Sequence, residues 1–244
     1  FKSTFPRKAI DLSLKSMNQI VAVSNYTKSL VTHLKKQVIV IPNGIDFSHW
    51  KKNSVKKHQV IQGDPILTTV GRVSKRKGQL QVINHLPSLL KIYPDLHYHC
   101  LGIPTEADDF IQVAKSLNVE HHVTFHGAVT DEFLKHIFDN TDIFLMLSTE
   151  SKTGDVEGFG IAILEANAYG IPAIGSKGCG IEDAVKQGYS GFLIDVDNAN
   201  DFRDGIESIL KDKDFFKSNA VLWAQQHDWN VIIKQYNDLL KCQH

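Results

Sequence analysis

The sequence lacks an excess of charge of either sign. Its 244 residues include 27 lysines and arginines and 27 aspartates and glutamates, so the formal net charge at pH 7 is zero. Proteins that recruit nucleic acid through their overall field carry a strong positive excess. The balance therefore argues against a nucleic-acid partner, and the basic pairs Lys51-Lys52 and Lys56-Lys57 are local features.

Long apolar runs and cysteines are also scarce. No stretch approaches the roughly 20 apolar residues of a membrane-spanning helix, and no secretory signal peptide is visible. The three cysteines, Cys100, Cys179 and Cys242, have no metal-site spacing, and their odd number does not suit a disulfide framework. We therefore expect a cytoplasmic protein whose contact with a membrane, if it makes one, is peripheral and at the inner face.

What the sequence does contain is a regular alternation of short apolar runs and helical patterns from Pro65 onward. At 42% hydrophobic and 22% charged residues, the composition is that of a globular protein. The alternation predicts an α/β fold, a Rossmann-like parallel sheet with helices on both faces. The predicted strands are Ile66–Val70, Leu96–Leu101, Val123–His126, Ile143–Leu147, Pro172–Ile174 and Gly191–Ile194, and the predicted helices between them are Gln79–Ile92, Asp108–Leu117, Asp131–Phe138, Gly158–Tyr169 and Ile181–Lys186.

The two ends of the chain differ from this central part. Before it, the patterns predict a helix, a strand, a helix capped by Ser24 and a second strand, which make one and a half β/α units with no sheet of their own; their ranges are Ala9–Met17, Ile20–Val23, Ser24–Leu34 and Val38–Ile41. Pro42-Asn43-Gly44 predicts a hinge turn, and Lys51–Gly63 a surface loop. Three further helices are expected at Phe202–Leu210, Phe215–Gln226 and Trp229–Leu240. The expected domains are 1–41, 42–226 and 227–244.

Two carboxylates, Glu157 and Glu165, lie eight residues apart, and Gly158, Phe159 and Gly160 follow the first of them. We expect a helix to begin at Gly158, which would separate the carboxylates by roughly 12 Å along its axis. The unpaired amides and the positive dipole end of a helix N-terminus favour a phosphate. The pattern suits a nucleotide sugar with its diphosphate at the glycines, its sugar near Glu157 and its ribose toward Glu165. The alternative is a capping carboxylate followed by a surface charge.

A second motif, Gly71–Gly78, follows the strand Ile66–Val70 and precedes a helix. Arg72 can hold phosphate oxygens in a bidentate fork, and Lys77 can add a point charge. The alternative is a solvated basic loop. In a parallel sheet, however, ligands bind at the carboxyl ends of the strands. This loop, Gly102, Gly127 and the segment Ser148–Glu157 are all expected at that edge.

Together these motifs resemble the group 1 glycosyltransferases of family 4, which are retaining enzymes of the GT-B fold. The resemblance spans nearly the whole chain and rests on six segments in the same order: Val23-Ser24, Ile41–Asp46, Gly71-Arg72 with Lys77, Val123–Gly127, Glu157–Gly160 with Glu165-Ala166, and Gly191–Leu193. It implies that this chain is the C-terminal, donor-binding domain of such an enzyme. Residues 1–41 would then be the end of the N-terminal, acceptor-binding domain and the hinge, and 227–244 the helix that crosses back to it.

The resemblance also implies the ligands and the residues that bind them. The donor would be a UDP- or GDP-sugar, the acceptor a glycan or lipid-linked molecule, and neither a metal nor another cofactor would take part. Glu157 would face the donor sugar as a sugar-positioning carboxylate. The implied roles at the other positions are diphosphate neutralisation by Arg72 and Lys77, ribose binding by Glu165, and close approach to the donor by Gly71, Gly127, Gly158, Phe159 and Gly160.

The sequence departs from the family in two respects. It matches only the end of the first domain, so the acceptor site and a glycine-rich loop that faces the donor phosphates are missing. We therefore expect weak nucleotide binding and little transferase activity from this chain alone, with an N-terminal domain or a second copy completing the site. In Gly178-Cys179-Gly180, a cysteine that we expect to fill space separates two glycines that the family often pairs.

Two other functions fit parts of the sequence. A non-catalytic nucleotide-binding subunit, or half of a split transferase acting with a partner chain, would also carry the donor motifs. A phosphorylase-like enzyme of the same fold would need pyridoxal phosphate, and no lysine stands in a suitable context for it.

Weaker signals have ordinary explanations. Asp195-Val196-Asp197 matches the metal-binding triplet of GT-A transferases, but it follows a late strand. The histidines His97, His99, His121, His122 and His126 form no convincing ligand set, and we expect them at the surface or in packing.

The predicted first and last helices each carry residues that could contact a membrane or a partner. Basic residues near the start, with Phe1, Phe5 and Leu12, would allow contact with an anionic membrane, although a solvated or domain-packed helix is the simpler reading; they are Arg7, Lys8 and Lys15. The apolar side of the last predicted helix, which contains Trp229 and Ile232, is expected to meet a partner.

Overall fold

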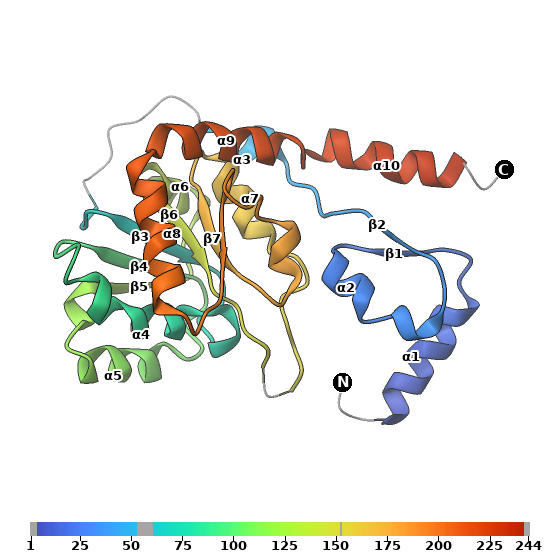
Figure 1. The fold of residues 1–244 in the computed structure, drawn as a ribbon, viewed down its shortest axis with the longest axis horizontal. Coiled ribbons are helices and arrows are strands. Elements are labelled where there is room, and N and C mark those ends of the chain that lie inside the picture. The colour runs from blue at the N-terminus through green and yellow to red at the C-terminus, as the bar shows by residue number, and fades with distance from the viewer. Residues whose placement is uncertain (1–3, 53–60, 152, 242–244) are drawn as a thin grey trace.

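A parallel sheet of six strands forms the centre of the molecule in the computed structural model, which describes residues 4–52, 61–151 and 153–241. The strand order is β5-β4-β3-β6-β7-β8, so the sheet grows from β3 in one direction and from β6 in the other (Figure 1). Nucleotide-binding sheets of this order bind their ligand where the direction reverses. The strands are β3 Ile66–Val70, β4 His97–Leu101, β5 Val123–Gly127, β6 Ile143–Met146, β7 Ala173–Ser176 and β8 Gly191–Ile194. The predicted Rossmann-like fold is confirmed.

Helices cover both faces of the sheet because its central strands are apolar on both sides. In β6, Ile143 and Leu145 belong to one hydrophobic core, while Phe144 and Met146 belong to the other. The first core is closed by α4, α5 and α8, and the second by α6, α7 and α9. These helices are α4 Gln79–Leu89, α5 Ala107–Ser116, α6 Asp131–Asn140, α7 Ile161–Ala168, α8 Ala199–Lys211 and α9 Lys213–Gln225.

The start of α7 corrects a prediction from the sequence. The helix begins at Ile161, not at Gly158, because Gly160 has φ +96° and ψ +53°, outside the right-handed helical region. Residues 157 to 160 therefore approach the helix as a turn, and the expected spacing of roughly 12 Å along one helix axis does not apply. The helix predicted at Ile181–Lys186 is likewise a single 3₁₀ turn, η4 Gly180–Asp183.

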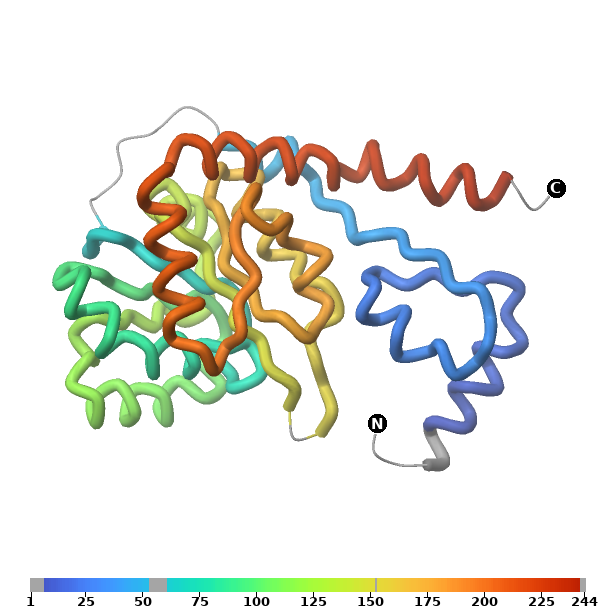
Figure 2. Tube along the Cα trace, viewed as in Figure 1, coloured from blue at the N-terminus to red at the C-terminus, as the bar shows by residue number. Residues whose placement is uncertain are grey.

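A small module precedes the central sheet. Its elements are α1 Thr4–Ser16, β1 Ile20–Ala22, α2 Asn25–Ser29, η1 Thr32–Leu34 and β2 Val38–Val40. The prediction that this part has no sheet was wrong, since β1 and β2 pair in parallel. Ile20, Ala22, Leu34 and Val38 give it a core of its own, which explains why so short a pair of strands persists. We call residues 4–41 the first module, and Figure 2 shows it to one side of the main body.

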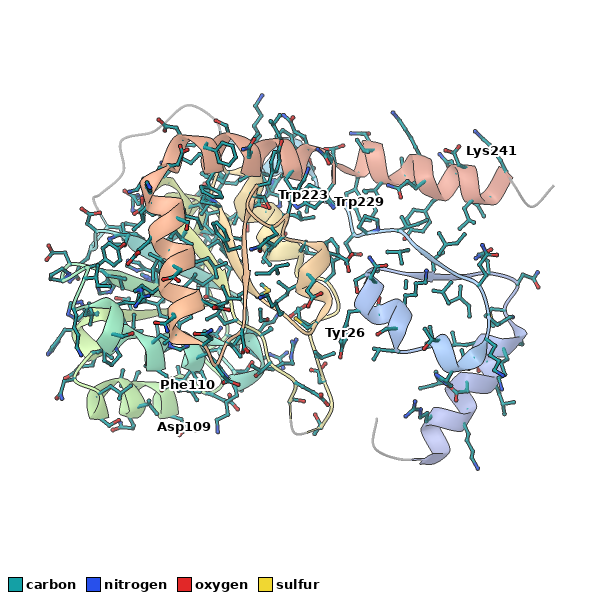
Figure 3. The ribbon with its side chains drawn as sticks, viewed as in Figure 1. Tyr26, Asp109, Phe110, Trp223, Trp229 and Lys241 are labelled. Carbon is teal, nitrogen blue, oxygen red and sulfur yellow. The ribbon has the colours of Figure 1, made fainter. Side chains whose placement is uncertain are left out.

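Two chain crossings join the first module and the last helix, α10 Trp229–Lys241, to the main body. They are tied to each other, because Ile45 N–H donates to His227 O at 2.9 Å and Trp229 N–H donates to Ile45 O at 3.0 Å. The Trp229 ring lies against the backbone of Gly44, where a Cβ would approach ring carbon Cδ2 to 2.6 Å. We call this contact of residues 44–45 with 227–229 the crossing clasp. Trp229 is labelled in Figure 3, at the start of α10.

The terminal helices expose apolar side chains. Leu12 of α1 is 69% exposed, and Arg7, Lys8 and Lys15 of the same helix are exposed too. Phe1 lies outside the described residues, as does most of the predicted loop Lys51–Gly63. Among the helices that the structure describes, none has both the length and the apolar character needed to cross a membrane.

The crossing clasp leads to a test of stability. Gly44 is buried and has no left-handed backbone requirement, and the three atoms nearest to an added Cβ all belong to the Trp229 ring. Gly44→Ala should lower the free energy of unfolding by about 1–3 kcal/mol, because overpacking forces the ring to move. In a Trp229→Ala background the same change should cost nothing. Chemical denaturation of the two single variants and the double variant measures this coupling, and an equal cost in both backgrounds would contradict the contact.

Candidate functional site at the carboxyl edge of the sheet

The loops that follow β3 and β6 are locked together at the carboxyl edge of the sheet. The first loop ends in the 3₁₀ turn η2 Lys75–Lys77 and Gly78. A Cβ at Gly78 would lie 2.1 Å from Leu147 O, so the two backbones touch directly. Thr149 N–H also donates to Arg76 O at 3.0 Å. The strand neighbours β3 and β6 thus bring the predicted basic loop against the segment that leads to Glu157.

The carboxylate of Glu157 binds two cations from the β3 loop. Its Oε2 lies 2.5 Å from Lys77 Nζ and 3.0 Å from Arg76 Nη1. The Glu157 side chain is only 16% exposed. This burial by itself would raise the pKa of Glu157, but the hydrogen bonds and charges of Lys77 and Arg76 outweigh it and hold the pKa below its usual value. Glu157 is therefore ionised at neutral pH.

Arg76 is a site residue that the sequence reasoning missed. It also contacts Asp155 Oδ2 through Nε at 3.0 Å, so it holds two carboxylates of the β6 loop. Predicted Arg72 is exposed and lines a separate cavity of about 560 Å³ with Arg76 and Asp155 among its walls. The run Lys75-Arg76-Lys77 did not show which cation would turn inward, because its 3₁₀ geometry was not predictable from composition.

A cavity of about 350 Å³ gathers several of the predicted residues. It is lined by Lys77, Met146 and residues 157–162, which include Glu157, Gly158, Phe159 and Gly160, and also by Val23 and Asn43. The last two come from the first module and from the turn after it. Gly71 lies beneath Lys77, whose Cε would be 3.6 Å from a Cβ there. The cavity is therefore shared between the main body and the first module.

The backbone at the mouth of α7 is held through its carbonyl groups. Gly180 N–H donates to Glu157 O at 2.9 Å, and Ser24 Oγ donates to Gly158 O at 2.7 Å. A Cβ at Gly180 would lie 1.9 Å from Gly158 O, so only glycine allows this approach. Among the described residues, no acceptor receives a hydrogen bond from the amides of residues 158–160. Three successive N–H groups thus lack an acceptor among the described residues, beside the positive end of α7, where an anion would be favoured.

Glu165 has the opposite environment. It lies in the second turn of α7, and burial, followed by the charge of Asp131 at the start of α6, raises its pKa from 4.5 to about 6. Gly127 ends β5, with φ +71° and open space where a Cβ would stand. Neither Glu165 nor Gly127 lines the cavity of Lys77 and Glu157. Two carboxylates of one segment therefore hold their protons with different strengths.

The histidines form a packed, hydrogen-bonded group on β4 and β5. His99 Nδ1 lies 2.9 Å from His126 Nε2, and His97 Nε2 lies 2.8 Å from Thr124 Oγ1. Burial, and then neighbouring histidines, lower the pKa of His97 and His126 to about 4, so these two side chains are neutral at pH 7. Across the described ranges, no three His, Cys, Asp or Glu side chains are grouped as a metal site would require.

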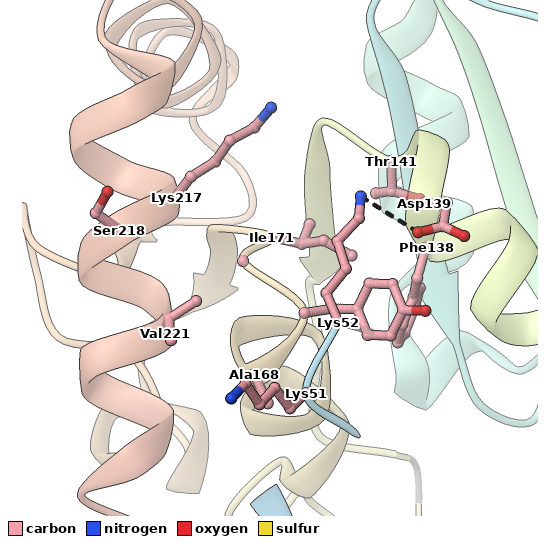
Figure 4. Close-up of a pocket in the computed structure, with 12 residues that line it drawn as sticks. Lys51, Lys52, Phe138, Asp139, Thr141, Ala168, Ile171, Lys217, Ser218 and Val221 are labelled. Carbon is pink, nitrogen blue, oxygen red and sulfur yellow. Dashed lines mark ion pairs between the residues drawn. The ribbon is translucent and has the colours of Figure 1, made fainter. Parts of the chain in front are cut away.

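A second cavity, of about 380 Å³, lies at the opposite edge of the sheet (Figure 4). Its walls include Thr141, before β6, and Ile171, before β7. Lys52 Nζ lies 3.2 Å from Asp139 Oδ1 and 5.9 Å from the centre of the Tyr169 ring. None of the predicted site residues lines this cavity, so we place the functional site at the carboxyl edge.

Known glycosyltransferases resemble this chain in sequence. A family model described as glycosyl transferases group 1 matches residues 51–234. The chain is 27% identical over 236 residues to a GDP-mannose-dependent alpha-(1-6)-phosphatidylinositol monomannoside mannosyltransferase of Mycobacterium tuberculosis, a match that covers 91% of this chain and 61% of that protein. It is 25% identical over 217 residues to an N-acetyl-alpha-D-glucosaminyl L-malate synthase of Bacillus anthracis, which covers 86% of this chain and 54% of that protein. This chain spans only part of the length of both relatives.

Solved structures share the fold. The crystal structure of HepE from Anabaena in complex with UDP matches with a TM-score of 0.81 at 22% identity and covers 99% of this chain and 68% of that one. Sucrose-phosphate synthase from Thermosynechococcus elongatus matches with a TM-score of 0.79 at 20% identity and covers 100% of this chain and 64% of that one. The family model matches well over half of the chain, and this protein therefore belongs to the glycosyl transferases group 1 family.

Proposed function

We propose that this chain is the donor-binding part of a retaining glycosyltransferase. It binds a UDP- or GDP-sugar, and the complete enzyme transfers the sugar to a glycan or lipid-linked acceptor with retention of the anomeric configuration. The observation that carries the proposal is the ionised Glu157 held by Lys77 and Arg76 beside three unengaged amides at the mouth of α7. A relative named for its dependence on GDP-mannose and a structural neighbour bound to UDP support it.

In this proposal the cavity shared with the first module receives the donor diphosphate and sugar. The amides of residues 158–160 and the ammonium of Lys77 face the phosphate oxygens, and Arg72 reaches them from the neighbouring cavity. Gly71 and Gly127, which lack side chains, leave room for the donor at two strand ends. Glu165 accepts hydrogen bonds from the ribose hydroxyls, since an ionised carboxylate is a strong acceptor.

The chemistry follows from where charge develops. When the bond between the anomeric carbon and the phosphate oxygen breaks, the leaving nucleoside diphosphate gains negative charge. Preorganised cations and N–H groups stabilise this charge more than they stabilise the bound donor. The acceptor hydroxyl attacks the same face of the sugar and passes its proton to the leaving phosphate oxygen. Glu157 positions the sugar, and no residue needs to form a covalent intermediate in this scheme.

Arg76 explains how an acidic side chain tolerates an acidic ligand. Diphosphate and Glu157 repel each other, and Lys77 alone cannot neutralise both. Because Arg76 binds Glu157 and Asp155 at 3.0 Å each, Glu157 keeps a cationic partner when Lys77 turns to phosphate. The proposal requires neither a metal nor another cofactor.

A second candidate is a nucleotide-binding subunit of a split transferase. It is favoured by the exposed apolar side chains of α10, among them Trp229 at 47% and Ile233 at 48%. An N-terminal domain or a second copy of the chain is the proposed occupant of that face, and a lipid surface is the proposed source of a lipid-linked acceptor. Turnover of UDP-glucose or GDP-mannose with glycan and lipid acceptors by the chain alone would favour the enzyme over the subunit, and NMR of the product would show whether configuration is retained.

Removal of either proposed phosphate-binding cation should weaken nucleotide binding. Losing one charge-assisted hydrogen bond costs about 1.5–3 kcal/mol, so Arg72→Ala and Lys77→Ala should each raise the Kd of UDP or GDP by about 10- to 150-fold. Isothermal titration calorimetry measures the change, with thermal denaturation to show that the variants are folded. Lys211→Ala, at the end of α8, is the control. Unchanged affinity in both site variants would remove the assignment.

Glu165 makes donor binding depend on pH. Its pKa is about 6 in the free protein, and ribose hydroxyls bind the ionised form, so the proton must leave when the donor binds. Affinity should therefore be highest above the free-protein pKa and fall as pH drops through it, by about tenfold between pH 7 and pH 5. The ligands for this titration are UDP-glucose and GDP-mannose, because their diphosphates stay ionised throughout this range.

Glu165→Gln is the matched variant for the pH titration. It keeps the size of the side chain and removes the titrating group, so its affinity should be independent of pH over the same interval. A wild-type profile as flat as that of the variant would show that Glu165 does not bind the donor in its ionised form.

A further inference from the structure

We propose that Ser24 of the first module is a positioning residue for the donor site, and that its hydroxyl group sets the orientation of the peptide between Gly158 and Phe159. The inference rests on the proposed function, since it concerns the amides that would bind the donor phosphates. Its consequence is that donor affinity depends on how the first module is seated against the main body.

Ser24 makes the buried contact between the first module and Gly158. Its side chain is fully buried, and it caps α2 by accepting a hydrogen bond from Thr27 N–H at 3.0 Å. The single hydroxyl hydrogen goes elsewhere, to Gly158 O at 2.7 Å across 134 positions of sequence. The Ser24 hydroxyl oxygen therefore accepts a hydrogen bond within the first module, and its hydrogen is donated to the backbone of the donor site. A capping role alone would not require the second bond.

Because a peptide group is planar, the bond from Ser24 to Gly158 O also fixes the direction of the Phe159 N–H. The peptide after Gly158 is trans, because the only cis bond among the described residues is Asp64-Pro65. In a trans peptide the C=O and the N–H point in opposite directions. A carbonyl held toward Ser24 thus directs the N–H of Phe159 away from Ser24, where no described residue accepts its hydrogen bond.

The adjacent peptide is fixed in the same way from the main body. Glu157 O accepts from Gly180 N–H, which directs the N–H of Gly158 away from Gly180. Gly180 begins η4, and Asp183 ends it. Asp183 receives two hydrogen bonds from Asn25, from its backbone N–H at 2.8 Å and from Nδ2 at 2.6 Å. Ser24 therefore binds the Gly158–Phe159 peptide directly, while Asn25 binds the 3₁₀ turn whose first residue holds the preceding peptide.

The Ser24–Gly158 contact should contribute more to this orientation than the Asn25–Asp183 contact. Asn25 is exposed, and water competes for its bonds to Asp183. The Ser24 hydroxyl is fully buried, so water has less access to this bond, and its loss would leave the Gly158 carbonyl without its partner. The orientation of the Phe159 amide thus depends mainly on Ser24. By linkage, a nucleotide that needs this orientation also stabilises the docking of the first module, by the same factor. Figure 3 shows α2, where Tyr26 is labelled, on the side of the module nearest the main body.

Ser24→Ala and Thr27→Val form a matched pair that separates positioning from capping. Thr27 supplies the other half of the capping box through Oγ1 and makes no hydrogen bond to the main body. Both substitutions weaken the cap of α2, but only Ser24→Ala removes the bond to Gly158. We expect Ser24→Ala to raise the Kd of UDP or GDP about five- to tenfold, and Thr27→Val to leave it within about twofold. Ser24→Thr, which keeps the hydroxyl that Ser24→Ala removes, should bind UDP or GDP about as well as the wild type.

Calorimetry with UDP and GDP, together with hydrogen exchange, decides the question. In the wild type, nucleotide should slow exchange of the amides of α2, and in Ser24→Ala this protection should disappear. If Ser24→Ala does not fold, Ser24→Gly replaces it, because glycine caps helices at little cost. If the wild type binds nucleotide but Ser24→Ala and Thr27→Val bind it with equal affinity, this inference is overturned and the proposed function is not. A wild type that binds neither UDP nor GDP would overturn the proposed function and this inference with it.

Discussion

The structure around the site depends on one constraint, which is that the largely buried charge of Glu157 needs cationic partners. An unpaired carboxylate in such a place would be costly. Lys77 and Arg76 meet this need only if the β3 loop packs directly on the end of β6, and the glycine at position 78 permits that packing. The direction reversal of the sheet between β3 and β6 brings both loops to one place. Strand order, loop packing and charge are therefore parts of one arrangement.

The two glutamates show how one short segment obtains two chemical characters. Glu157 is stabilised as an anion by cations from another loop, while burial and the charge of Asp131 disfavour the ionised form of Glu165. Environment, not residue type, separates their proton affinities. The same logic applies to the histidines of β4 and β5, which burial keeps neutral and which act in packing.

The sequence predicted the sheet more completely than it predicted the site. Strands such as β3 and β8 were found at their observed bounds, because short β-rich runs bounded by residues such as Pro65, Gly71 and Asp195 leave few alternatives. The start of α7 was missed because the left-handed conformation of Gly160 depends on its neighbours in space. Arg76 and Ser24 were missed as site residues for a related reason: their partners lie 81 and 134 positions away, and no local pattern encodes such pairs.

The crossing clasp has a mechanical consequence. Two strands of chain connect the main body with the peripheral elements, and separate crossings would allow each to bend on its own. Here Ile45 is hydrogen bonded to both His227 and Trp229, so neither crossing can be displaced without moving the other or breaking these bonds. Asn43, which lines the cavity, lies directly before the clasp. The clasp therefore ties the position of this wall of the cavity to the start of α10.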